Sequence, residues 1–101
     1  MNRTELYRFH KYVTDEAYRI FTERNEDRAM DEDALSNLRG EAMMCGKAVD
    51  DHALDYVALK LFRVQHGHKQ GTDIYDDLKD MINYIIIFMA LKHKRPPKET
   101  P

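Results

Sequence analysis

The chain has 101 residues, of which 43% are hydrophobic and 34% are charged, and its net charge is −2. This length fits one domain that can bury a core, and the hydrophobic content excludes a disordered chain. The near balance of 16 basic and 18 acidic residues gives no reason to expect a nucleic-acid-binding surface. The single cysteine, Cys45, excludes an internal disulfide, and the lack of a signal-peptide pattern adds to the expectation of a reducing cytoplasm.

Two segments in the first half of the chain have apolar residues at helical spacing. The first helix is expected over 4–24, with Thr4 as its N-cap. Its apolar stripe consists of Leu6, Phe9, Val13, Ala17, Ile20 and Phe21. A charged break over 25–32 precedes a second helix, which is expected over 33–45 and ends before Gly46.

A third segment is expected to be helical over 50–65. The side chains expected to face inward from this helix are Leu54, Val57, Ala58, Leu61 and Phe62. Gly67 and Gly71 are expected to bracket the loop that follows it.

The last helix is expected over 72–94, with Thr72 as its cap, and it is acidic in its first half and apolar nearly all round in its second half. A helix that is apolar on every side must be enclosed by other helices. Its apolar run is too short to cross a bilayer, which requires roughly 20 apolar residues. The four segments therefore predict one all-α domain over 1–95, a four-helix bundle with short connections, and a polar tail over 96–101.

Acidic side chains gather on the last two of these helices. Positions three or four apart share a helix face, so the aspartates of each helix can converge on one point. Mg²⁺ prefers several carboxylate oxygens and keeps water molecules that a phosphate can replace. The predicted metal ligands are Asp51, Asp55, Asp76, Asp77 and Asp80. The alternative is that these aspartates cap helices or form a solvated acidic face, and both interpretations stay open.

Two pairs of neighbouring residues complete the predicted site. Lys60 and Arg63 share a face of the third helix and could contact phosphate oxygens. They could equally cover apolar neighbours or pair with the aspartates of the last helix. Asn83 and Tyr84 interrupt the apolar run of the last helix, where they would serve either as hydrogen-bonding groups of the core or as contacts to a nucleotide base.

The order of these residues resembles that of the small, mostly phage-encoded MazG-like and nucleotide modification associated domains. On the third helix the resemblance rests on Asp51, Lys60 and Arg63, in that order. On the last helix the matching residues are Asp76, Asp80, Asn83 and Tyr84. The stretch 24–27, Arg-Asn-Glu-Asp, is similar to the family's Arg-Asn-x-Asp-Tyr-Gly motif, and the match covers about 20–92.

The broader family of all-α nucleoside triphosphate pyrophosphohydrolases pairs acidic motifs on two helices, and Asp51 to Asp55 and Asp77 to Asp80 fall in those places. The resemblance implies a bundle that commonly dimerises, Mg²⁺ held by the carboxylates, and cleavage between the α and β phosphates by an activated water. It makes Asp77 and Asp80 the candidate catalytic carboxylates. The chain departs from the family at Arg28 and Ala29, which replace Tyr-Gly, and at His52, which replaces a second glutamate.

Two functions are therefore expected, one for each interpretation of the acidic residues. The first is a cytoplasmic MazG-like domain that binds a nucleotide or nucleoside phosphate and, if active, is a Mg²⁺-dependent pyrophosphohydrolase. If the chain is phage-encoded, the compartment is the host cytoplasm. The second is a catalytically inactive helical protein that binds and inhibits a host or defence factor. Its aromatic anchors would be Tyr7, Tyr12, Tyr18 and Phe21.

Overall fold

The computed structural model describes residues 1–28 and 35–93. The described residues form the helices α1 (Arg3–Arg28), α2 (Ser36–Met44), α3 (Val49–Gln70) and α4 (Tyr75–Lys92). No strand occurs among them, which confirms the all-α class. None of these helices combines the length and the apolar character that crossing a bilayer requires. The predicted break over 25–32 is wrong for 25–28, which continue α1. Its remaining residues, 29–32, and the predicted tail over 96–101 lie outside the described residues.

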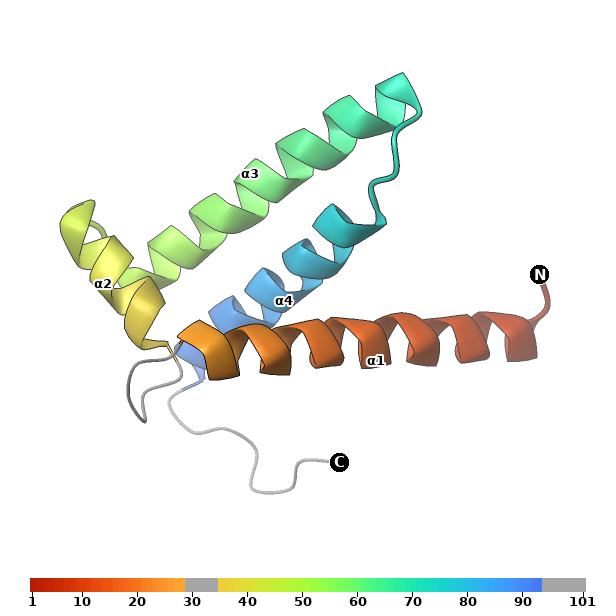
Figure 1. Ribbon diagram of the computed structural model, residues 1–101, viewed down its shortest axis with the longest axis horizontal. Coiled ribbons are helices and arrows are strands. Elements are labelled where there is room, and N and C mark those ends of the chain that lie inside the picture. The colour runs from red at the N-terminus through yellow and green to blue at the C-terminus, as the bar shows by residue number, and fades with distance from the viewer. Residues whose placement is uncertain (29–34, 94–101) are drawn as a thin grey trace.

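α3 and α4 lie side by side as an antiparallel hairpin (Figure 1). The predicted loop from Gly67 is wrong, because α3 continues to Gln70 and ends at Gly71, whose φ of 71° is left-handed. Gly67 lies inside the helix, and the connection to α4 folds back onto it. A Cβ atom at Gly67 would lie 2.8 Å from Ile74 Cγ2, so the close approach of the connection explains the glycine.

The predicted caps Thr4 and Thr72 are also wrong. α1 already begins at Arg3, and Asn2 caps it by accepting a hydrogen bond on Oδ1 from the backbone N–H of Glu5 at 2.8 Å. Before α4, Oδ1 of Asp73 accepts a hydrogen bond from the backbone N–H of Tyr75 at 2.9 Å. The hydroxyl of Thr72 instead donates to the carbonyl oxygen of Gly67 at 3.0 Å, which fastens the connection to the end of α3.

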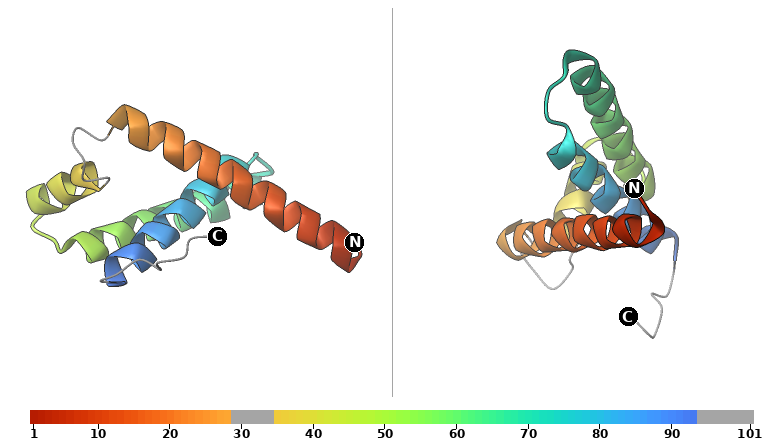
Figure 2. Two further views of the ribbon diagram at one scale, coloured as in Figure 1. Left: turned by 90° about the horizontal axis from the view of Figure 1, so that it is seen from below. Right: turned by 90° about the vertical axis from the view of Figure 1, so that its right-hand side faces the viewer.

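α1 crosses α4, and α2 packs against α3 (Figures 1 and 2). The crossing is held by Asn83 of α4, which is 8% exposed and donates from Nδ2 to the carbonyl oxygen of Ala17 at 2.9 Å. Ala17 is buried at this point, and its small side chain allows the two helix backbones to approach. The first half of α1 extends past α4 and the rest of the fold (Figure 2).

The expectation that the other helices enclose α4 is wrong. Few apolar residues are buried among the described ones, and most of them are small. They are Ala17, Leu38, Ala42 and Ala53. On α4, Ile85, Ile86 and Met89 are all exposed. Among residues 1–28 and 35–93 the four helices are therefore openly arranged, and these residues cover α4 on only part of its circumference.

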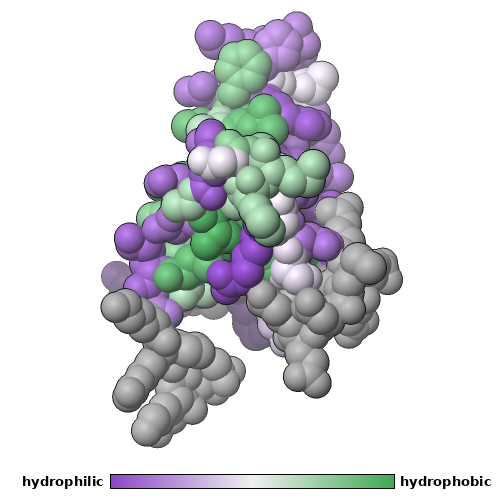
Figure 3. All heavy atoms as spheres, turned by 90° about the vertical axis from the view of Figure 1, so that its left-hand side faces the viewer, coloured by the Kyte–Doolittle hydropathy of each residue, from purple (hydrophilic) through white to green (hydrophobic). Residues whose placement is uncertain are grey.

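The inward-facing set predicted for α3 is also largely wrong. Leu54, Leu61 and Phe62 are exposed, because the α3 face that meets α4 is a different one. That face carries Tyr56 and Lys60, whose partners are on α4. Apolar side chains consequently lie among the charged ones on the outer surface, as the face in Figure 3 shows.

Candidate functional site

Five charged side chains from three helices meet where α1 crosses the α3–α4 hairpin. Asp80 of α4 contacts Arg24 of α1 at 2.5 Å and Lys60 of α3 at 3.1 Å. Asp77, one turn earlier on α4, lies 3.5 Å from Lys60 Nζ and 3.4 Å from Arg63 Nε. We call these five residues the ion cluster. Its positions follow from helical spacing, since Asp77 and Asp80 are three apart and so are Lys60 and Arg63.

The ion cluster has a buried floor and an open rim. Asp80 is 8% exposed, and the side chain of Lys60 is nearly as well covered. The guanidinium-bearing side chains of Arg24 and Arg63 are at least half exposed. Three cationic groups face two carboxylates within the cluster, so its open side carries an excess of positive charge that suits an anion. Lys60 and Arg63 thus pair with the aspartates of α4, which was one of the two interpretations of these residues.

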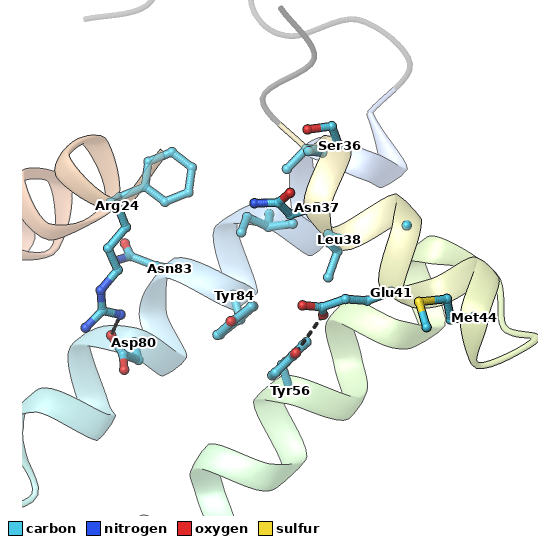
Figure 4. Close-up of a pocket in the computed structure, with 14 residues that line it drawn as sticks. Arg24, Ser36, Asn37, Leu38, Glu41, Met44, Tyr56, Asp80, Asn83 and Tyr84 are labelled. Carbon is cyan, nitrogen blue, oxygen red and sulfur yellow. Dashed lines mark hydrogen bonds and ion pairs between the residues drawn. The ribbon is translucent and has the colours of Figure 1, made fainter. Parts of the chain in front are cut away.

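A pocket of about 440 Å³ adjoins the ion cluster and is lined by residues of all four helices (Figure 4). Its floor is a stacked pair formed by Tyr56 of α3 and Tyr84 of α4, with ring centroids 4.6 Å apart and planes inclined by 6°. Arg24 and Asp80 line one side, and Glu41 of α2 lines the other. The pocket therefore combines a flat aromatic surface, an arginine and a carboxylate.

Hydrogen bonds fix the far side of this pocket. The hydroxyl of Tyr56 donates to Glu41 Oε2 at 2.6 Å (Figure 4), and Nε2 of His52 lies 3.2 Å from the same oxygen. The bond to Glu41, with burial second, raises the pKa of Tyr56 to about 12. Two buried polar atoms, Oγ of Ser36 and Nδ1 of His52, have no hydrogen-bond partner in the described part of the chain.

The structure separates the five predicted metal ligands. Asp77 and Asp80 come together, but each already faces cationic groups. Asp55 pairs with Lys47, and Asp51 and Asp76 are exposed. The contact of Asp50 with Lys92, at 3.5 Å, shows that the start of α3 lies beside the end of α4, whereas Asp77 is near the beginning of α4.

This donor set does not fit a magnesium ion as it stands. Within residues 1–28 and 35–93 no group of three or more His, Cys, Asp or Glu side chains is disposed to hold a metal. Mg²⁺ requires near-ideal octahedral geometry and oxygen ligands, while the two converging carboxylates here are neutralised by arginine and lysine. We therefore derive no metal-dependent step from this geometry, and the Mg²⁺ site remains a prediction of the resemblance.

Of the residues predicted to contact a base, Asn83 and Tyr84 both line the pocket. The Nδ2 of Asn83 is already bonded to Ala17, as described above, whereas Tyr84 presents its ring as part of the stacked floor. Sequence reasoning did not assign Tyr56 or Glu41 to a site. A signal existed for Tyr56, because it is three residues after Ala53 and four before Lys60 and so shares their helix face.

A scan against protein-family models and searches of curated proteins and of solved structures find no match to this chain.

Proposed function

We propose that the chain is a MazG-like nucleotide-binding domain that holds a nucleoside phosphate where the pocket meets the ion cluster. The observation that carries this proposal is the adjacency of two complementary surfaces. The stacked rings of Tyr56 and Tyr84 line the pocket and are the aromatic surface beside which we place a planar base, and Arg24, at the border of pocket and cluster, offers charge to a phosphate. The order of the Lys60, Arg63, Asp80 and Asn83 motif along the chain supports the same ligand class.

Binding would use contacts whose typical strengths are known. Stacking of a base on an aromatic side chain contributes about 1–3 kcal/mol. Arg24 can contact a phosphate through its exposed edge while Lys60 continues to neutralise Asp80. One carboxylate oxygen of Glu41 accepts a hydrogen bond from the Tyr56 hydroxyl, and the other can accept a hydrogen bond from an amino or imino group of the base.

Hydrolysis is not part of this proposal, because the converging carboxylates Asp77 and Asp80 are paired with cations. Mg²⁺-dependent cleavage by these two residues remains a prediction of the family resemblance. A direct check is to incubate the chain with each nucleoside triphosphate and Mg²⁺ and to follow pyrophosphate release. As part of the proposal we place the chain in the cytoplasm, where nucleotides are abundant.

The test is a thermal-shift screen of nucleoside mono-, di- and triphosphates, with and without Mg²⁺, followed by calorimetry on any hit. A ligand at one hundred times its Kd stabilises the fold by about 2.7 kcal/mol. Arg24→Gln is expected to weaken binding roughly tenfold or more, since it removes a charge-assisted contact. The matched control is Lys11→Gln, which removes one exposed cation from the same helix, where it pairs with Asp15 one turn further on.

Two results would argue against the proposal. A flat screen with every nucleotide would remove it, and so would a hit whose affinity is the same in wild type and Arg24→Gln. Binding that also needs Mg²⁺ and is lost in Asp77→Asn would instead revive the metal site predicted from the resemblance.

A second candidate function, a helical interaction protein that inhibits a host or defence factor, is favoured by the aromatic side chains on α1. Tyr7, Tyr12 and Tyr18 are all exposed, and aromatic residues dominate the energetics of protein interfaces. Recovery of one stoichiometric protein from host lysate, together with a flat nucleotide screen, would decide for this function. If Tyr12→Ser no longer recovers the partner protein and Lys11→Gln still does, the binding surface lies on α1.

A further inference from the structure

One side of the pocket presents a carboxylate that two donors hold in place. Glu41 of α2 accepts a hydrogen bond on Oε2 from the Tyr56 hydroxyl at 2.6 Å, and Nε2 of His52 lies 3.2 Å from the same oxygen. Because a carboxylate oxygen only accepts, Nε2 of His52 carries the hydrogen of this contact. Both donors belong to α3, so the orientation of the Glu41 side chain is fixed before a ligand enters.

The other carboxylate oxygen of Glu41, Oε1, keeps its capacity to accept hydrogen bonds. An ionised carboxylate has about four acceptor sites, two on each oxygen. Tyr56 and His52 occupy the two sites of Oε2, and within residues 1–28 and 35–93 no group donates to Oε1. Glu41 lines the pocket and its side chain is half exposed, so a ligand can reach Oε1 (Figure 4).

The pocket wall next to Glu41 is open as well. Gly40 lies within α2 and lines the same pocket, and a Cβ atom there would meet no heavy atom within 4 Å beyond its own surroundings in the helix. Glycine destabilises the interior of a helix relative to alanine, and no close contact in the described part of the chain requires it at this position. The missing side chain leaves room for the edge of a flat ligand beside Glu41.

The charges of the pocket set the direction in which a nucleotide would lie. The volume of about 440 Å³ is within the range of small-molecule sites. Arg24 lines one side of the pocket, and Glu41 lines the other (Figure 4). With the phosphate at Arg24, as in the proposed function, the edge of the base that is farthest from the sugar faces Glu41.

The bases differ in what this edge presents to an acceptor. Guanine has two adjacent donors, N1–H and the 2-amino group. Adenine and cytosine have an amino group beside the lone pair of a ring nitrogen, and uracil and thymine have one N–H between two carbonyl oxygens. A carboxylate oxygen with two open acceptor sites matches the two donors of guanine. With any of the other bases it also meets a lone pair, which repels its negative charge.

We propose that Glu41 makes this pocket selective for guanine nucleotides, with Oε1 accepting hydrogen bonds from N1–H and the 2-amino group of the base. The inference rests on the proposed function, because it takes the phosphate to lie at Arg24. Arg24 contributes to the binding of every nucleotide, whereas Glu41 distinguishes between bases. Hydrogen bonds to a charged group are stronger than neutral ones, so GMP is expected to bind at least about tenfold more tightly than AMP.

The test is isothermal titration calorimetry of the full chain with GMP, IMP, AMP, CMP and UMP in the absence of Mg²⁺. IMP lacks only the 2-amino group of GMP, so the wild type is expected to bind it roughly threefold to tenfold more weakly. In Glu41→Gln the amide oxygen still accepts from Tyr56 and His52, which turns the amide N–H groups towards the base. GMP is then expected to lose its advantage over AMP, while AMP still binds.

The matched control is Glu5→Gln, which neutralises an exposed glutamate in the first turn of α1, whereas Arg24 is near the end of that helix. Circular dichroism checks that each variant is folded, and the comparison of GMP with IMP needs no variant. Equal affinities of the wild type for GMP and AMP would overturn the inference, and so would a preference for GMP that survives in Glu41→Gln.

The same titrations separate this inference from the proposed function. If all five nucleotides bind equally well and Arg24→Gln weakens each of them, the pocket binds nucleotides without the selectivity proposed for Glu41. If none of the five binds, the proposed function and the inference both fall.

Discussion

Removal of the charge of Asp80 tests whether the ion cluster stabilises the fold. Asp80→Asn keeps the shape of the side chain but takes the carboxylate away from Arg24 and Lys60. At 3.1 Å and an effective dielectric constant of 20, the interaction with Lys60 alone has a gross Coulomb energy of about 5 kcal/mol. Much of this is recovered, because Lys60 keeps Asp77 and the half-exposed Arg24 returns to water. The expected net loss is about 2 kcal/mol.

The assay is thermal unfolding followed by circular dichroism, in which that loss lowers the Tm by about 10 °C for a domain of this size. Asp76→Asn is the control, since Asp76 is an exposed residue of the same helix, and its expected effect lies within about 0.5 kcal/mol. An Asp80→Asn variant as stable as the wild type, or more stable, would refute the reasoning. The free-energy cost of burying the Asp80 carboxylate would then exceed the energy of its ion pairs with Arg24 and Lys60. Such an excess is typical of a charged group that serves to bind a ligand.

Four further substitutions probe other parts of the fold. Asn83→Ala removes its hydrogen bond to the carbonyl oxygen of Ala17, which keeps its backbone donor within α1, and urea unfolding is expected to show a loss of about 0.5–1.5 kcal/mol. Two glycine substitutions should change the free energy of unfolding in opposite directions, again measured with urea. Gly40→Ala, with open space around its Cβ, should stabilise α2 by about 0.5–1 kcal/mol, whereas Gly67→Ala should destabilise, because overpacking costs about 1–3 kcal/mol. The pKa of Tyr56, about 12, is above its usual value near 10, so the stability that this raised pKa contributes is complete below pH 10 and is lost as the pH rises through 12. Unfolding at pH 9 and 11.5 should show a smaller decline in Tyr56→Phe than in wild type, and equal declines would contradict the assignment.

Local patterns predicted the helices but not all of their ends. Apolar periodicity located the four helices of the described residues, and each lies near its predicted range, except that α1 runs on to Arg28 and α3 to Gln70. The glycine at position 67 signals a loop in sequence, because glycine is a poor helix former. Its actual role is to let the α3–α4 connection pass close to the helix, and that proximity exists only after the hairpin has formed. Similarly, the apolar residues of α3 lie on more than one face, and sequence alone does not say which face meets α4.

The candidate site was predictable where it depends on spacing within one helix. The convergence of Asp77 with Asp80, and of Lys60 with Arg63, follows from positions three apart. The separation of Asp51 from them follows from the antiparallel register of α3 and α4, which no periodicity contains. Arg24 and Glu41 enter the site from helices far away in sequence, so their contribution depends on the way the chain folds back.

The crossing of α1 over α4 has a consequence for how the chain matures on the ribosome. Asn83 and Ala17 are 66 residues apart, so α1 is synthesised well before α4, the helix that it crosses. Contacts of such high sequence separation form late, whereas the α3–α4 hairpin closes locally and early. Until α4 has been synthesised, the apolar stripe of the nascent α1 stays exposed to water or is bound by a chaperone. In hydrogen exchange on the folded protein, the amides of α1 are expected to have a lower free energy of local unfolding than those of the α3–α4 hairpin.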